Sequence, residues 1–335
     1  MEKKFSEKFK ITGTQEDFDF VDIRLWTDQE LFIDPSLIMR AQHKENQKGN
    51  KEMDYATRAH KSLQSFFSTF FEIFRDIHPS KLIKGKDQGA KGINRDEKIF
   101  NLLKYSAENN ALRLGYTVGK SKGTGCSPEM IYDFFANMKF KHPKMLDFIK
   151  EPFHTSGFIN EIGEDRSTDL TVSIILDVLC DFTLFICNKY AIPTEKFQQF
   201  RNYWDPNEKM WKTRDYDLPI DEKGDAIVLV PKSFVTKEFR YNANYVLKNY
   251  ILVEKLDELK TQYPSKEWNK KDALKKIRLE HPDSFNKDLV LEYFVKRPDS
   301  YEGFMNRVNN GVLGTHLGLL TDAEIEKATN KFEEG

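Results

Sequence analysis

The stretch from Gly157 to Pro193 constrains the fold of this chain more than any other segment. Its second half has the spacing of a helix that is apolar on nearly every face. The apolar side chains of this half are Val172, Ile174, Ile175, Val178, Leu179, Phe182, Leu184, Phe185 and Ile186. A helix of this kind must be covered on all sides in a soluble protein, and Pro193 prevents it from continuing. We therefore expect a buried central helix over residues 170–188.

The cellular compartment is predicted from the lack of a membrane span, a signal peptide and a disulfide pattern in the sequence. Asp177 and Asp181 interrupt the apolar run, which makes it a poor membrane span, and the N-terminal segment lacks the apolar core of a signal peptide. The three cysteines are Cys126, Cys180 and Cys187. Their odd number and spacing fit neither a disulfide framework nor a cysteine-based zinc site. We expect a cytoplasmic protein that does not associate with a membrane.

The pattern along the chain predicts an α+β fold that is mostly helical, with a small sheet packed on the central helix. Phenylalanines at helical spacing over residues 57–77 predict a second core helix. Strands are expected as a hairpin over 18–34, a short strand over 111–118 and a buried strand over 226–230. We expect two regions: residues 1–235, a mixed α/β core, and residues 236–335, a helical C-terminal region. In the latter, residues 303–320 resemble a loop.

Charged residues crowd the entrance to the central helix. Asp165 and Asp169 are four residues apart, so on a helix they share a face and repel each other unless a cation or an arginine lies between them. Arg166 stands between them in the sequence. Alternatively, Asp165 caps the helix and Asp169 is stabilised by the positive helix end. This junction is therefore either a site or a helix start.

Three further segments carry candidate residues. Asp34 follows a predicted strand, where its carboxylate either faces a cleft or stabilises the turn into the next helix. A loop with Lys120, Lys122 and Gly123 combines small residues with positive charge, which suits a phosphate, although a surface loop has the same composition. Lys232 emerges just beyond the predicted buried strand.

Four of these pieces together resemble a widespread group of uncharacterised bacterial proteins that is associated with mobile elements and phage-defence loci. The pieces are Leu31-Phe32-Ile33-Asp34-Pro35, Leu114-Gly115-Tyr116 with its Gly/Ser/Lys loop, Gly163-Glu164-Asp165-Arg166-Ser167-Thr168-Asp169-Leu170-Thr171 and Leu229-Val230-Pro231-Lys232. Glu108 lies just upstream of the second piece. The resemblance spans residues 20–240 and implies a role in defence.

Several carboxylates and a lysine favour a metal-dependent nuclease. The expected ligands of Mg²⁺ or Mn²⁺ are Asp34, Glu108, Asp165 and Asp169. The metal would activate a water, Lys232 would neutralise the phosphate and Arg166 would clamp it. We expect Asp165, Asp169 and Lys232 to be catalytic, and Arg166, Lys120, Lys122 and Gly123 to contact nucleic acid. The chain departs from the common restriction-nuclease core, because Val230 stands where acid-x-Lys needs a carboxylate.

The alternative is a non-catalytic sensor or adaptor subunit that binds a protein or nucleic acid in a defence complex. It would use the Gly/Lys loop and the aromatic residues between Phe197 and Trp211, since aromatic rings among cations stack bases. The net charge of −1 means that any nucleic-acid contact needs a local basic patch. A nuclease, in contrast, must bring Asp165 or Asp169 close to Lys232.

Overall fold

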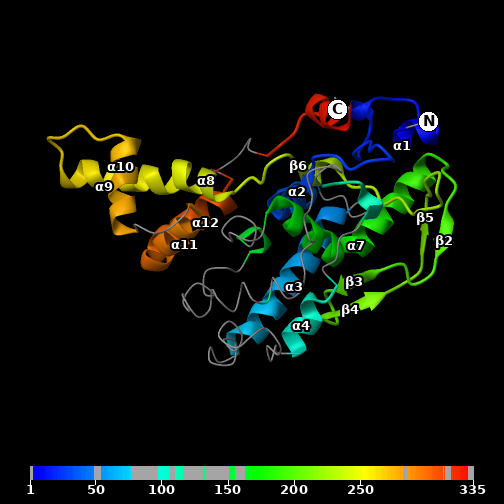
Figure 1. Ribbon diagram of the computed structural model, residues 1–335, viewed down its shortest axis with the longest axis horizontal. Helices are drawn as coiled ribbons and strands as arrows, with labels where there is room; N and C mark the ends of the chain where they lie inside the picture. Colours follow the sequence, from blue (N-terminus) through cyan, green and yellow to red (C-terminus); the bar gives the residue numbers. More distant parts are fainter. Residues whose placement is uncertain are drawn as a thin grey trace, which may run out of the picture.

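The computed structural model describes residues 3–48, 54–76, 97–105, 110–115, 132, 151–154, 163–281, 286–311, 313 and 318–330. Helices dominate this part of the chain, and its strands form small two-stranded sheets (Figure 1). The predicted fold class, mostly helical α+β, is confirmed.

The helical elements as far as residue 234 include one long helix, α7. They are α1 (Phe5–Lys8), η1 (Gln15–Asp17), α2 (Pro35–Lys48), α3 (Tyr55–Asp76), α4 (Glu97–Leu103), η4 (Asn110–Leu112), α7 (Glu164–Lys189) and η6 (Lys232–Phe234). The C-terminal elements are α8 (Ala243–Val246), the π-helical turn η7 (Leu247–Ile251), α9 (Leu252–Gln262), α10 (Lys270–Glu280), α11 (Asn286–Lys296), α12 (Pro298–Asn309) and α13 (Asp322–Asn330).

The strands are short and pair antiparallel. They are β1 (Phe32–Ile33), β2 (Glu195–Phe197), β3 (Asn202–Asp205), β4 (Met210–Thr213), β5 (Tyr216–Leu218) and β6 (Val235–Thr236). The pairs are β1 with β6, β2 with β5, and β3 with β4. The β3–β4 hairpin packs on α7 through β3.

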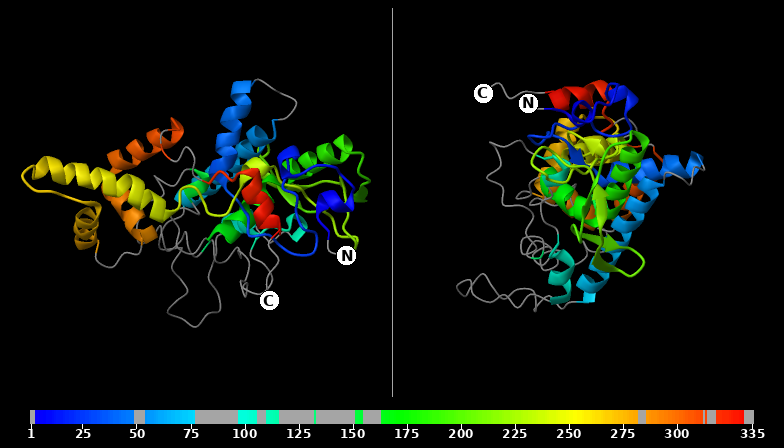
Figure 2. Two further views of the ribbon diagram at one scale, coloured as in Figure 1. Left: turned by 90° about the horizontal axis from the view of Figure 1, so that it is seen from above. Right: turned by 90° about the vertical axis from the view of Figure 1, so that its right-hand side faces the viewer.

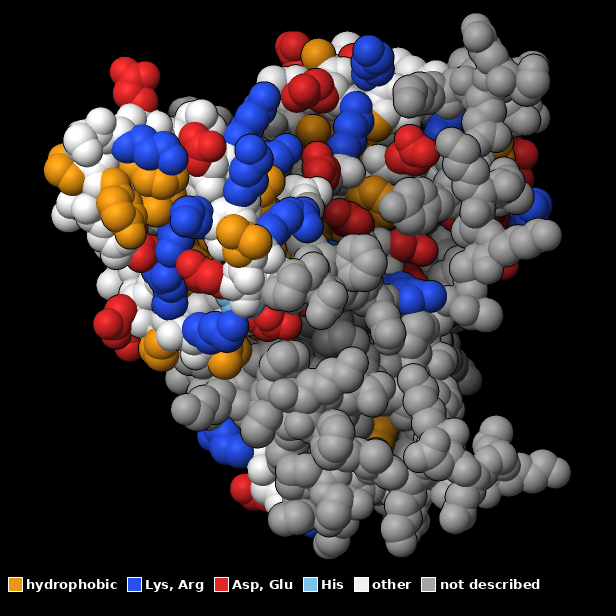
Figure 3. All heavy atoms as spheres, turned by 60° about the vertical axis from the view of Figure 1, so that its left-hand side comes forward, with side chains coloured by type: hydrophobic (Ala, Val, Ile, Leu, Met, Phe, Trp, Pro, Cys, Tyr) orange, Lys and Arg blue, Asp and Glu red, His pale blue; other side chains and the backbone are white. Residues whose placement is uncertain are grey.

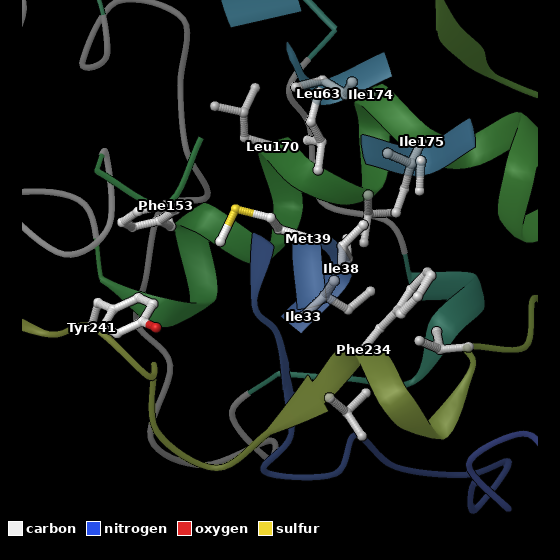
Figure 4. Packing of buried hydrophobic residues seen from close by; sticks show 14 of the residues in the cluster. Ile33, Ile38, Met39, Leu63, Phe153, Leu170, Ile174, Ile175, Phe234 and Tyr241 are labelled. Carbon is white, nitrogen blue, oxygen red and sulfur yellow. The ribbon is translucent and has the colours of Figure 1, made fainter. Parts of the chain in front are cut away.

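Helix α7 is the buried centre of the fold, as its apolar pattern predicts. It contacts α3, β1, β3 and β5, and Figure 4 shows Leu170, Ile174 and Ile175 of α7 among side chains of α2, α3 and β1. Within the described residues, α7 alone has the length and hydropathy of a membrane span, and 78% of its most apolar window is buried inside the protein. Protein side chains therefore cover the surface that lipid would cover in a spanning helix.

A bend interrupts α7 at Ile175, whose backbone torsions are not helical (φ −100°, ψ 15°). Two residues earlier, the Ser173 hydroxyl donates a hydrogen bond of 2.9 Å to the Asp169 carbonyl. A serine that bonds back to the preceding turn bends a helix. The bend therefore has a local cause in the sequence just before it.

The phenylalanine stripe of α3 forms the second half of the core. Phe66, Phe70 and Phe74 are buried on the face toward the rest of the protein. Phe66 meets the β3 side chain Trp204 edge-on, with ring centroids 5.2 Å apart. Trp204 is 0% exposed, and its indole N–H donates to the Ser65 hydroxyl. The predicted core helix over residues 57–77 is confirmed.

The predicted hairpin over residues 18–34 is wrong. Strand β1 pairs with β6, which lies about two hundred residues later in the chain, rather than with residues 18–26. The backbone of residues 18–26 bonds instead to separate partners; for example, the Val21 N–H donates to the Val230 carbonyl at 3.0 Å. Alternation of apolar residues indicates an extended, half-buried backbone, but it does not identify the partner.

The expected strands at 111–118 and 226–230 are neighbours without forming a regular sheet. The Val228 N–H donates to the Ala111 carbonyl, and Leu114 forms an isolated bridge with Gln29. The Ile227 N–H donates to the Pro219 carbonyl. The run 226–230 is buried, as predicted. Residues 116–118 lie outside the described part of the chain.

Helices α8 to α12 form a lobe at one end of the molecule (Figure 2). The expected loop at 303–320 is wrong for its first residues, which continue α12 to Asn309. Gly303 inside this helix has a packing reason: a Cβ there would lie 2.6 Å from the Tyr250 hydroxyl. That hydroxyl donates to the Ser300 carbonyl at 2.7 Å. The glycine lets α12 approach η7 closely.

Helix α13 returns to the N-terminal part and packs on η1. The ammonium of Lys232 lies 2.8 Å from the Asp322 carboxylate, and the ammonium of Lys4 donates to the Thr329 hydroxyl at 3.2 Å. Together with the β1–β6 pair, these contacts tie residues 1–235 to residues 236–335.

A charged cluster fastens the β3–β4 hairpin to the two core helices. Asp177 and Asp181 of α7 face Arg58 of α3 and Arg214, which follows β4. Asp181 bonds to both guanidinium groups, whereas Asp177 lies 3.6 Å from Arg58. Among the described residues, Asp177 Oδ1 is buried without a hydrogen-bond partner. Burial raises the pKa of Asp177 to about 6.

This pKa predicts how stability depends on pH. The folded protein holds the Asp177 proton more tightly than the unfolded chain, so ionisation lowers the free energy of unfolding as pH rises from about 4 to about 6. Asp177→Asn removes this loss. We expect the variant to gain about 1–3 kcal/mol over wild type between pH 4 and pH 7, measured by urea denaturation.

Asp181→Asn is the matched control, because it removes the carboxylate that bonds to both arginines. We expect it to be less stable than wild type at pH 7. A difference between Asp177→Asn and wild type that is the same at every pH would contradict the assignment to Asp177.

Candidate functional site

The acidic junction forms the first turns of α7. Gly163, with extended torsions, is the N-cap residue, and Glu164 and Asp165 lie in the first turn. The alternative that Asp165 itself caps the helix is therefore wrong, since it lies inside the helix. Its carboxylate is nevertheless in the first turn, where the positive end of the helix stabilises negative charge.

Three of the four motif pieces meet at this helix start. The Ile33 N–H of β1 donates to the Thr168 hydroxyl at 3.0 Å. A Cβ added to Gly115 would lie 2.9 Å from Asp165 Oδ1, and Gly115 has φ +132°, which disfavours any other residue. The Asp165 carboxylate thus lies against the backbone that leads into the Gly/Lys loop.

The C-terminal lobe also reaches this junction. The partly buried Lys287 of α11 has its pKa lowered by burial, and the carboxylate of Glu164 opposes that shift. Glu164 therefore lies close enough to Lys287 for a charge interaction. Arg166, Asp165 and Asp169 are half-buried beside it.

Asp34 follows Ile33, which bonds to the start of α7, but two backbone N–H groups already donate to the Asp34 carboxylate. It is 1% exposed. Its Oδ1 accepts from the Ser36 N–H at 2.7 Å and its Oδ2 from the Arg240 N–H at 2.8 Å. Burial raises the pKa of this carboxyl. These contacts match the alternative that Asp34 stabilises the turn into α2, and a metal would compete with both donors.

Lys232 points to a different place. Its ammonium pairs with Asp322 and also reaches the carbonyls of Gln15 and Glu16, each at 3.4 Å. It lines a pocket with Phe182 and Phe185. Phe182 is 13 residues beyond Asp169 in α7, a rise of about 20 Å. The structure therefore does not bring Lys232 to the Asp165–Asp169 pair.

The metal site of the nuclease hypothesis is incomplete in the described part of the chain. Among those residues, no group of three or more His, Cys, Asp or Glu side chains is placed to hold a metal ion. Glu108, Lys120, Lys122 and Gly123 lie outside the described residues. The roles predicted for them stay predictions.

The tryptophans expected to stack bases belong to the core. Trp204 is fully buried, and the Trp211 indole N–H donates to the Leu102 carbonyl at 2.7 Å. The two rings pack edge-on against each other, with centroids 5.7 Å apart. This packing leaves Trp204 with no face for a base.

A basic face on α10 is absent from the sequence-based predictions. Ala273 and Ile277 are buried, whereas Lys271, Lys275 and Arg278 are exposed on the opposite side. Figure 3, which brings this end of the molecule forward, shows Lys and Arg side chains gathered among hydrophobic ones. The signal was available in the sequence as the spacing i, i+4, i+7.

The lysines of this face are not neutralised by neighbours. Within the described residues, Lys271, Lys275 and Lys276 pair with no carboxylate. Lys270 is different, because its ammonium donates to the Lys248 carbonyl at 2.9 Å. The exposed face of α10 therefore presents several positive charges to solvent.

Comparison with known proteins identifies a family without assigning chemistry. Residues 10–242 match the family described as "Domain of unknown function (DUF8370)", and the chain belongs to this family. No curated protein and no solved structure matches the chain. The match contains all four motif pieces and ends before α8, so it agrees with the resemblance to an uncharacterised family. The basic face of α10 lies outside it.

The contacts of Asp34 predict a structural role. Asp34→Ala leaves two buried N–H groups without acceptors, one of them at the start of α2. We expect the free energy of unfolding to fall by about 2–4 kcal/mol, measured by urea denaturation. Asp19→Ala removes the exposed Asp19–Lys189 pair and should change it by less than about 1 kcal/mol. Equal stability of the two variants would contradict this role.

Proposed function

We propose that this protein is a non-catalytic nucleic-acid-binding subunit of a bacterial phage-defence complex. The observation that carries the proposal is the exposed basic face of α10. The setting in defence rests on the resemblance of the four sequence pieces. The binding function rests on charge, exposure and spacing in the C-terminal lobe.

The positive charge is local. Residues 260–280 contain seven Lys or Arg and three Asp or Glu, a net charge of +4, in a chain whose net charge is −1. Exposed charges more than about 10 Å apart are largely screened at 0.1 M salt. A polyanion that approaches α10 therefore responds to this cluster rather than to the charge of the whole chain.

The spacing suits a nucleic-acid backbone. Lys271, Lys275 and Arg278 follow one side of α10, over about 10 Å of helix axis. A strand of B-DNA carries one phosphate per ~3.4 Å of its helix axis. One strand can therefore place two or three phosphates along this face.

The first test is charge reversal. Lys271→Glu/Lys275→Glu should weaken binding to 30-nucleotide DNA or RNA by at least ~10-fold at 50 mM salt. The slope of log affinity against log salt should fall by about 2, since two phosphate contacts are lost. Fluorescence anisotropy over a salt series measures both quantities.

Lys209→Glu/Lys223→Glu is the control for this test. It makes the same change in net charge at two exposed positions, one between β3 and β4 and one after β5, and these strands lie far from α10 (Figure 1). We expect its binding to remain within about twofold of wild type. Equal weakening by both double variants would show that total charge, rather than the α10 face, governs binding, and absence of wild-type binding would reject the proposal.

Metal-dependent phosphodiester hydrolysis is the second candidate. It is favoured by the Asp165 carboxylate against Gly115, at the entrance to the Gly/Lys loop. Asp165 and Asp169 would hold Mg²⁺ or Mn²⁺ together with water ligands, and Glu108 would be a further ligand. Lys232 would have to leave Asp322 to act on a phosphate. These requirements make the candidate weaker than the binding function.

Asp169→Asn separates the two candidates. If the protein is a nuclease, this variant should lose on the order of a hundredfold in cleavage rate with Mg²⁺ or Mn²⁺, while its affinity for nucleic acid stays unchanged. Gel assays with DNA and RNA panels measure cleavage, with Asp19→Asn as the control. No cleavage by wild type, with binding intact, supports the non-catalytic proposal. Metal-dependent cleavage that requires Asp169 would contradict it.

A further inference from the structure

We propose that the end of the α9–α10 helical pair binds single-stranded nucleic acid by stacking an unpaired base on Tyr263, next to the basic face of α10. This inference rests on the proposed function and specifies its ligand class. It concerns residues 263–269, which connect α9 to α10 at the far end of the C-terminal lobe.

The α9–α10 pair carries exposed apolar side chains. In the described part of the chain, the large hydrophobic side chains that remain exposed are Met210, Tyr263, Leu279 and Leu319. The two most exposed belong to the α9–α10 pair: Tyr263 is 53% exposed and Leu279 is 76% exposed. An exposed aromatic ring next to a basic helix is the combination that proteins use to bind single strands.

The turn holds Tyr263 in place through its backbone. The Tyr263 N–H donates to the Leu259 carbonyl at 2.9 Å, which closes the last turn of α9. The Tyr263 carbonyl accepts from the Lys266 N–H at 3.2 Å and from the Trp268 indole N–H at 3.3 Å. The turn is therefore ordered before any ligand arrives, which reduces the entropic cost of binding.

Trp268 supports the tyrosine ring from within the turn. The two ring centroids are 5.9 Å apart and the rings are tilted by 47°. The ammonium of Lys266 lies 4.0 Å from the centroid of the Trp268 ring. The indole thus contacts both the tyrosine ring and a cation, and Tyr263 is the more exposed of the two aromatic residues.

This aromatic pair leads directly into the basic helix. Asn269, the residue after Trp268, caps α10: its side-chain oxygen accepts from the N–H groups of Lys271 and Asp272. Lys271, the first of the two lysines, therefore lies two residues past the cap. A strand whose phosphates follow these lysines can place a base at the adjacent turn.

The combination favours single strands over duplexes. In a duplex each base is already stacked between neighbours, and only its edges are accessible in the grooves. Unpaired bases stack on aromatic side chains, and replacing such a side chain with alanine weakens binding by roughly 5- to 150-fold per base. Phosphate contacts alone would not distinguish the two forms as strongly.

The test compares Tyr263→Ala, Tyr263→Leu and Tyr263→Phe with wild type. The probes are a labelled 30-nucleotide single-stranded DNA, a single-stranded RNA of the same sequence and the corresponding DNA duplex, measured by anisotropy at 50 mM salt. We expect Tyr263→Ala and Tyr263→Leu to bind single strands about tenfold more weakly. Tyr263→Phe keeps the ring and should bind like wild type.

Two further readouts separate stacking from charge. Duplex affinity and the salt slope should be the same in all three Tyr263 variants, because stacking releases no counterions. Tyr263→Leu keeps an apolar side chain against Trp268, so it remains informative if the alanine variant unfolds in a thermal melt. Poly-glutamate should compete poorly with the single-stranded probes.

The outcomes distinguish this inference from the proposed function. If Lys271→Glu/Lys275→Glu loses binding while Tyr263→Leu binds single strands like wild type, the stacking inference is overturned and the proposed function stands. Equal wild-type affinity for duplex and single strand, or efficient competition by poly-glutamate, also overturns it. If wild type binds no probe, both proposals fail.

Discussion

Covering α7 is the physical requirement on which the rest of the structure depends. This helix has 26 residues and apolar side chains on nearly all faces. Each of its methylene groups that stayed in water would cost the folded protein about 0.8 kcal/mol of stability. Helix α3, β1, β3 and β5 supply the cover, and the extended run 226–230 adds its own buried side chains. Asp177 and Asp181, the charged positions that interrupt the apolar run, lie where two arginines meet them.

Two of the four motif pieces contribute to this covering. The Ile33 N–H bonds to the Thr168 hydroxyl, and the Leu229 N–H bonds to the Thr183 hydroxyl at 2.8 Å. Both hydroxyls are on α7, one near each end. Carboxylates and lysines in such pieces indicate chemistry when only the sequence is considered, whereas here Asp34 and Lys232 complete the architecture. Among the described residues, the half-buried helix start and the exposed surface of the C-terminal lobe remain as candidate functional regions.

The periodicity of apolar residues correctly predicted the buried helices, because a helix forms its backbone hydrogen bonds within one segment and can be recognised without knowing what packs against it. The apolar pattern of α7 and the phenylalanine stripe of α3 are sufficient to predict two buried helices. The predicted hairpin over residues 18–34 was wrong because β1 is only two residues long and its partner strand, Val235–Thr236, is remote in sequence. The ion-pair partner of Lys232 could not be predicted for the same reason, since Asp322 lies 90 residues later. The α10 face, in contrast, could be read from lysine spacing alone.

The contacts of α13 and Tyr241 bear on how the protein can be divided for study. The family match ends at residue 242, but Tyr241 packs against Phe304, and its hydroxyl donates to the Leu313 carbonyl. The α13 helix likewise covers η1. A fragment cut at the family boundary would expose these apolar surfaces and release Lys232 from Asp322, so it would be prone to aggregate. The region that the family match covers is thus smaller than the part of the chain that packs together, and expression of the family region should extend through α13.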